Sequence, residues 1–74
     1  MKYKVGDKVT YSGAQMKFKG INAVIKHTKE NRVQIDDVTR GTILYPKDGY
    51  DYTIQFKRYG LITTVLDVLE DEIS

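Results

Sequence analysis

The chain has 74 residues, no cysteine and a formal net charge of +2. A chain of this length buries only about 60% of its unfolded surface, so we expect one small domain over residues 1–74. Without cysteine there is no disulfide and no thiolate nucleophile or metal ligand, which fits a reducing cytoplasm better than secretion. Neither a signal-peptide pattern nor an apolar run near the ~20 residues that span a bilayer is present. We therefore expect a cytoplasmic protein with no membrane partner.

The charge is unevenly distributed along the chain. Residues 1–60 contain all 12 Lys and Arg with six of the acids, and residues 61–74 contain the other four acids and no base. The basic part of the chain attracts polyanions, whereas the acidic end repels or shields them. The alternative is that both sets are solvated surface. We favour the alternative, because a nucleic-acid footprint is usually more lopsided.

Five segments show the alternation of polar and apolar residues that is typical of strands. They cover residues 8–11, 21–27, 32–36, 51–57 and 61–65, with glycines recurring between them. The run Asp51–Lys57 has the cleanest period of two. Short strands of this kind are stable when the sheet curls into its own second layer, which also removes exposed edges. The pattern predicts an all-β, five- to six-stranded barrel, with an interior of Val5, Val9, Tyr11, Ile21, Ala23, Ile25, Val33, Ile35, Ile54, Phe56, Val65 and Leu66.

The connections between these strands have local causes. Pro46–Gly49 is a strong turn, since Pro fixes φ early and Gly supplies a positive φ late, and Lys57–Gly60 turns the chain into the last strand. Residues 37–50 are longer than a tight connection and are expected to hold an extra strand at Thr42–Tyr45. For the C-terminal segment we expect a strand through about Val65 and then one irregular or 3₁₀ turn.

The spacing resembles the SH3-like barrel superfamily of the bacterial, KOW- and Tudor-like kind. The resemblance rests on Val5-Gly6-Asp7-Lys8-Val9, on Gly20 before Ala23-Val24-Ile25, on Val33–Asp36, on Tyr52–Phe56, and on Val65 with Leu69-Glu70. It implies a binding module for RNA, DNA, peptide segments or a larger machine, and not an enzyme. The chain has no Trp and no ALYDY-like segment, so proline-peptide recognition is not expected. Its richness in Lys, Ile and Tyr also resembles the accessory proteins of low-GC Gram-positive bacteria and their phages.

Catalytic and metal chemistry find little support in the residues. His27 is the only histidine, and the only serines are Ser12, in a turn, and Ser74, so a nucleophile with its base and orienting acid is not evident. Asp36-Asp37 and Asp48–Asp51 offer oxygen ligands, but their spacing matches no calcium loop and suits solvated strand ends. We expect no catalytic residue, no metal and no cofactor.

Basic residues beside aromatic ones are the candidate contact residues. In the first long loop, lysines flank Phe18; a second set, Lys57-Arg58-Tyr59, lies in the last hairpin, and Arg40 lies in the insertion of residues 37–50. Cations of this kind pair with phosphates while an aromatic ring stacks on a base. The alternative, which we favour for the loop, is that Met16 and Phe18 cap the open end of the barrel. The candidates are Lys17, Phe18, Lys19, Arg40, Lys57, Arg58 and Tyr59.

Three functions remain open at this point. The first is a non-catalytic accessory or regulatory module that docks on a larger protein through the loop 12–20 and neighbouring strand faces. The second is a nucleic-acid-binding module that uses the basic and aromatic candidates. The third is a structural subunit of a phage or other oligomeric assembly, joined through strand edges. We favour the first, because the net charge is small and the acidic end opposes a polyanion.

Overall fold

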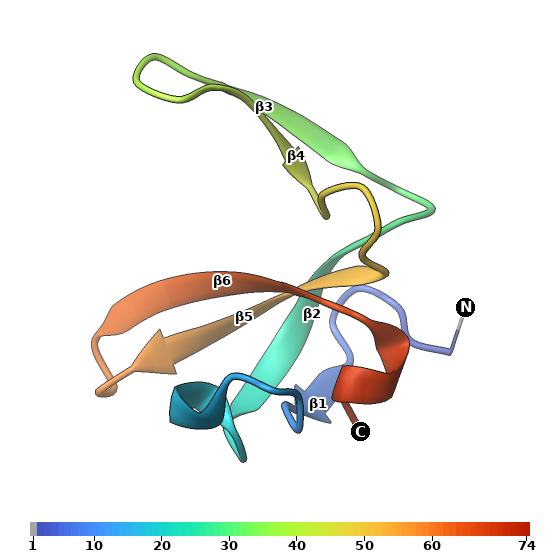
Figure 1. The fold of residues 1–74 in the computed structure, drawn as a ribbon, viewed down its shortest axis with the longest axis vertical. Helices are drawn as coiled ribbons and strands as arrows, with labels where there is room; N and C mark the ends of the chain where they lie inside the picture. Colours follow the sequence, from blue (N-terminus) through green and yellow to red (C-terminus); the bar gives the residue numbers. More distant parts are fainter. Residues whose placement is uncertain (1) are drawn as a thin grey trace.

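A computed structural model describes residues 2–74 and confirms that the protein is all-β (Figure 1). Within these residues the regular structure consists of six strands and two 3₁₀ turns. In chain order they are β1 (Lys8–Thr10), η1 (Met16–Phe18), β2 (Asn22–Thr28), β3 (Val33–Asp37), β4 (Gly41–Tyr45), β5 (Tyr52–Arg58), β6 (Ile62–Val68) and η2 (Glu70–Glu72).

The strands form two separate antiparallel sheets. One has four strands in the order β1-β2-β5-β6, and the other is the two-stranded β3–β4 hairpin. The C-terminal segment continues the larger sheet beyond β1, because Ile73 bridges to Tyr11 and Ser74 exchanges backbone hydrogen bonds with Thr10. The strands of residues 2–74 do not close into a barrel.

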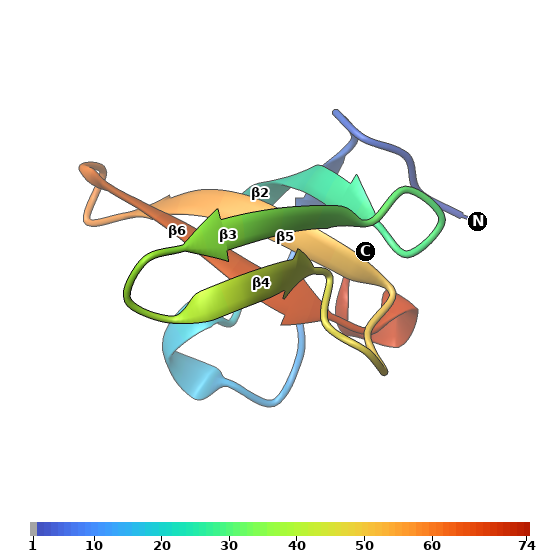
Figure 2. The same ribbon diagram turned by 90° about the horizontal axis from the view of Figure 1, so that it is seen from above.

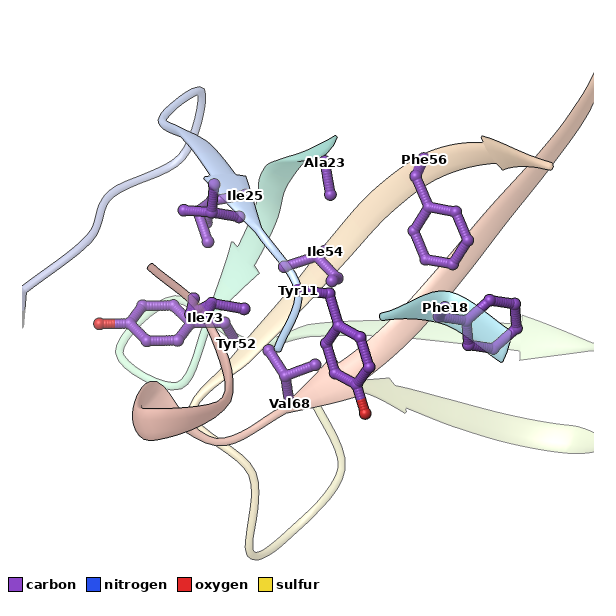
Figure 3. Packing of buried hydrophobic residues seen from close by; sticks show 10 residues of the cluster. Tyr11, Phe18, Ala23, Ile25, Tyr52, Ile54, Phe56, Val68 and Ile73 are labelled. Carbon is purple, nitrogen blue, oxygen red and sulfur yellow. The ribbon is translucent and has the colours of Figure 1, made fainter. Parts of the chain in front are cut away.

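The two faces of the larger sheet have different surroundings. Residues opposite each other in neighbouring strands share a face, so Tyr52 with Val68 and Ile54 with Leu66 mark the inner face. This face packs against β1, η1 and the C-terminal segment. The buried core side chains are Val9, Tyr11, Phe18, Ala23, Ile25, Tyr52, Ile54, Phe56, Val68 and Ile73 (Figure 3).

The predicted interior is correct for eight residues, which are buried or packed against the core, and wrong for four that are exposed. Val65 and Leu66 are neighbours in one strand, so only one of them can face inward, and Leu66 does so opposite Ile54. Val33 and Ile35 belong to the hairpin, which pairs with itself and not with the larger sheet. Val5 lies in the turn that precedes β1.

The C-terminal end follows the expected order of elements with different bounds. The last strand continues three residues beyond Val65, to Val68, and the expected 3₁₀ turn is η2. Val68 and Ile73 enter the core on either side of this turn, and neither was in the predicted interior.

The expected extra strand at Thr42–Tyr45 is present as β4. It pairs with β3 in a continuous register from Val33 opposite Tyr45 to Asp37 opposite Gly41. Figures 1 and 2 show this hairpin over the outer face of the β5–β6 pair, while η1, β1 and η2 lie on the inner side. The larger sheet is therefore covered by a packed core on one side and by a hairpin on the other.

A polar network fastens η2 to the larger sheet. The buried Tyr52 hydroxyl donates to Glu70 Oε1 at 2.8 Å and accepts from the backbone N–H of Tyr3 at 3.1 Å. The Asp51 carboxylate accepts from the Glu70 N–H at 2.8 Å and from Lys29 Nζ at 3.0 Å. Burial raises the pKa of Tyr52, whereas the Tyr52 hydroxyl lowers the pKa of Glu70 and the Glu70 N–H lowers that of Asp51. These carboxylates are therefore structural.

Candidate binding surfaces

The first long loop, residues 12–20, is a structural loop with exposed lysines. Phe18 is buried, and its ring packs edge-on against Phe56 with the centroids 5.1 Å apart (Figure 3). The expected burial of Phe18 is thus confirmed, although it packs on an open sheet and not in the end of a closed barrel. That of Met16 is wrong, because this side chain is 75% exposed. Lys17 Nζ lies 5.0 Å from the centroid of the Phe18 ring, and Lys19 is exposed.

The turn between β5 and β6 presents an aromatic side chain to solvent. The Leu61 N–H donates to the Arg58 carbonyl at 3.1 Å, and the two central residues, Tyr59 and Gly60, both have positive φ. Tyr59 is the only non-glycine residue in residues 2–74 with a positive φ, at 53°, and it is 89% exposed. A bulky side chain in this conformation is strained, and such strain concentrates at functional positions. Tyr59 therefore stays a candidate contact residue.

The predicted basic residues lie in three separate segments: η1 with its flanks, the tip of the β3–β4 hairpin with Arg40, and the β5–β6 turn. Figure 1 places the hairpin tip and η1 at opposite ends of the longest axis, with the β5–β6 turn between them. Arg58 Nε, at the end of β5, is buried without a hydrogen-bond partner among the described residues. Because Phe18 is buried, Tyr59 is the only aromatic candidate of the set that a ligand can reach.

A cleft of about 710 Å³ separates the β3–β4 hairpin from β6. We call it the hairpin cleft, and its lining includes Gln15, Arg40, Thr42–Tyr45, Lys47 and Val65–Asp67. Sequence reasoning missed this cleft, because it is formed by strands that are not hydrogen-bonded to each other.

Two contacts beside the hairpin cleft attach the end of the hairpin to the larger sheet. Tyr45 stacks on His27 of β2 with ring centroids 5.7 Å apart. The Lys47 N–H donates to Asp67, which also accepts from the Thr53 hydroxyl at 2.7 Å. Partial burial and the positive charge of Lys26 lower the pKa of His27, which favours the neutral ring in this stack. His27 is therefore part of the structure that positions the hairpin.

Apolar side chains line both walls of the hairpin cleft. Val33 opposite Tyr45 and Ile35 opposite Ile43 share one face of the hairpin. The stacking of Tyr45 on His27 shows that this face is turned toward the larger sheet. Ile35 is nevertheless 46% exposed beside the cleft, and Val65, which lines it, is 43% exposed. The apolar part of the lining is formed by Ile43 and Leu44 on the hairpin side and by Val65 and Leu66 on the β6 side.

A second depression, of about 900 Å³, lies over β1, β2 and β5. We call it the lysine groove, because Lys8, Lys26 and Lys57 line it and none of its described lining residues is Asp or Glu. Of the predicted cations only Lys57 belongs to it. Lys8 and Lys26 were missed, although both are the polar partners in the alternation that predicted their strands.

The acidic clusters are separate and locally bonded. Asp36 accepts from Thr42, and Asp37 accepts from the hydroxyl and N–H of Thr39, the hydroxyl being the main cause of its lowered pKa. Asp48 pairs with Arg32. Over residues 2–74 no three His, Asp or Glu side chains are grouped so that they could hold a metal ion.

Neither a membrane-spanning helix nor a known relative accounts for these surfaces. In the described part of the chain no helix has the length and apolar character needed to cross a bilayer. Comparison with protein-family models, with curated proteins and with solved structures found no match for this chain. Its function is therefore inferred from its own surfaces.

Proposed function

We propose that the protein is a non-catalytic binding module that docks on a larger protein through the hairpin cleft. The observation that carries the proposal is the set of apolar side chains that face each other across the cleft, Ile43 and Leu44 on the hairpin side and Val65 and Leu66 on the β6 side. Full burial of one such side chain is worth about 1.5–3 kcal/mol. A 74-residue chain that leaves several of them half-exposed has that energy available for a partner.

The charges at the hairpin cleft fit a protein partner with acidic groups. Arg40 and Lys47 line the cleft, and neither forms an ion pair within residues 2–74. The two acids nearby are already engaged, Asp48 with Arg32 and Asp67 with Thr53. An apolar centre with a polar, charged rim is the usual anatomy of a protein interface.

We further propose that the fold is an opened SH3-like barrel. The proposal is supported by the continuous order from the C-terminal segment through β1, β2 and β5 to β6, which curls around one core. The hairpin is then an insertion between the second and third strands of that barrel. In this arrangement the hairpin cleft occupies the place where the barrel is open.

Site-specific photo-crosslinking in the cell of origin tests the docking proposal. A photoreactive residue at Ile35, which is 46% exposed and lies opposite the cleft-lining Ile43 on the same face of the hairpin, should give a discrete adduct with one protein. The same residue at Val24 is the matched control, because Val24 is 41% exposed on a strand outside the cleft and should give none. Absence of an adduct at position 35, or equal adducts at both positions, would refute docking through the cleft.

The lysine groove supports a second candidate function, nucleic-acid binding. Three lysines without an acidic neighbour in the lining form a surface that attracts phosphates. Titration with short single- and double-stranded DNA or RNA at low and moderate salt tests it. Amide shifts at Lys8, Lys26 and Lys57 that fade steeply with salt would support this candidate. Shifts at residues 17–20 and 57–59 would instead support the loops predicted from the sequence, and no shift at low salt would exclude both.

A further inference from the structure

The two edges of the larger sheet differ in how they are covered. At the β1 edge the strand is three residues long, and Ser74 occupies its free backbone groups by bonding to Thr10 at 2.8 and 3.0 Å. At the other edge β6 is seven residues long and, within residues 2–74, pairs with β5 alone. Its register with β5 is continuous from Ile62 to Val68, without a bulge. Its other side therefore offers a row of unpaired backbone N–H and C=O groups.

The β6 edge also lacks the features that usually prevent strand pairing. Lys, Pro and bulges are the common protections of an edge strand, and the segment ITTVLDV contains none of them. Its single charge, Asp67, accepts hydrogen bonds from Thr53 and from the Lys47 N–H. Nothing in the composition of β6 opposes the addition of another strand.

The free edge of β6 forms part of the hairpin cleft. Val65–Asp67 of β6 line the cleft together with Thr42–Tyr45 of β4, and β4 also pairs on one side only among the described residues, with β3. The cleft is thus bounded by two strands, each of which is paired on one side only among the described residues. Gln15 lines it as well, from the loop that precedes η1.

We propose that the hairpin cleft binds an extended segment of the partner protein, which adds to β6 as a further strand. This inference rests on the proposed docking function and names its ligand class. A segment of five to seven residues spans roughly 17–23 Å. Its side chains alternate, so that apolar residues on one face meet Val65 and the apolar face of the hairpin, and an acidic residue meets Arg40 or Lys47. The backbone hydrogen bonds supply affinity and the alternate side chains supply specificity.

An extended segment suits this site better than a second copy of the chain. The cleft is bordered by β4 and by Gln15, so a folded sheet approaching the β6 edge would meet the hairpin and the first loop. A single extended strand occupies only the width between neighbouring strands, about 4.8 Å on each side. Self-association is accordingly an outcome that would count against the inference.

A display library of random heptapeptides is the probe. Selection on the immobilised protein should enrich peptides with alternating apolar residues and one acid, and these should shift the amides of β6 and β4. Two forms of an enriched peptide are then made, with N-methyl groups on the odd-numbered or on the even-numbered residues; each keeps its side chains but loses half of its backbone N–H donors. One of the two forms should bind at least tenfold more weakly than the parent peptide. Failure to enrich such peptides, equal binding of both N-methylated forms and the parent, or shifts confined to the lysine groove would overturn the inference.

Proline substitution in β6 gives an independent check from the protein side. Backbone N–H groups alternate between β5 and the free edge, so one of Thr63→Pro and Thr64→Pro removes only an outward donor. The variant that keeps the native amide spectrum should lose the enriched peptide, and retained binding would contradict strand addition. The docking proposal is tested separately: a protein adduct at Ile35 without any N-methyl-sensitive peptide would retain docking and reject the strand.

Discussion

The two sides of the four-stranded sheet differ in how completely their apolar residues are used. On the inner side, residues distant in sequence such as Tyr11, Phe18 and Ile73 meet in one buried cluster. On the outer side, the β3–β4 hairpin covers the sheet in part and leaves Ile35, and Val65 in the cleft, half-exposed. The inner side is therefore the source of stability. The outer side carries the same residue types without packing them, as expected of a surface that binds another molecule.

The largest difference is expected when loop residues are truncated. Phe18→Ala removes a buried ring that contacts Phe56 and should lower the free energy of unfolding by ~3–5 kcal/mol, close to the whole stability of so small a domain. Met16→Ala, two residues away and exposed, should change it by less than about 0.5 kcal/mol. Urea unfolding followed by circular dichroism measures both. Similar losses in the two variants would contradict the assignment of Phe18 to the core.

The same substitution made in the core and in the hairpin compares the stability that the two sides contribute. Ile25→Thr places a hydroxyl in the core and should cost about 2–4 kcal/mol. Ile35→Thr keeps a β-branched residue in the hairpin and should cost no more than about 0.5 kcal/mol. Thermal unfolding of both variants gives the comparison. A large loss at Ile35 would mean that the hairpin face is packed and the cleft closed.

A smaller effect is expected at a glycine below the sheet. A Cβ at Gly13 would lie 2.6 Å from Cζ of the buried Tyr11 ring and 2.5 Å from Glu72 Oε2. Gly13→Ala should therefore destabilise the protein by roughly 1–3 kcal/mol through overpacking. At Gly20, where φ is +86° and a Cβ would have no atom within 4 Å, the cost of alanine comes from the backbone alone. Equal stability of wild type and Gly13→Ala would refute the packing of this loop.

The smallest effect is a pH dependence that belongs to the inner side. The pKa values of Asp51 and Glu70 are lowered in the folded protein, so the unfolded chain binds more protons as the pH falls. The stability they contribute is present above their unfolded pKa values, about 4, and is lost as the pH falls through the folded ones. Glu70→Gln should flatten this decline in urea unfolding series, whereas Asp71→Asn should not. An unchanged slope in Glu70→Gln would contradict the network around Tyr52.

The inner side was predictable from the sequence because its signals are local. Alternation in the segments of β2 and β5 placed Ile25, Ile54 and Phe56 inside, and the size of Phe18 favoured burial over ligand contact. The same alternation could not tell which apolar face reaches a core. Val33 and Ile35 have the pattern of a buried strand, yet their strand pairs with β4 and leaves both side chains exposed.

The candidate sites were less predictable because they depend on tertiary arrangement. The hairpin cleft needs β4 and β6 to lie near each other without pairing, and nothing in the spacing of either strand states this. The lysine groove was easier to predict from the sequence, since Lys8 and Lys26 occupy the outward positions of strands that were predicted. Attention to aromatic neighbours selected Lys17 and Lys19 in their place.

The most direct test of docking through the hairpin cleft is the yield of the Ile35 photo-adduct in two matched backgrounds. Val65→Lys and Val24→Lys place the same charge on the same face of the sheet at similar exposure, and only Val65 lines the cleft. We expect the adduct to be lost with Val65→Lys and retained with Val24→Lys. Equal yields in the two backgrounds would show that the partner does not occupy the hairpin cleft.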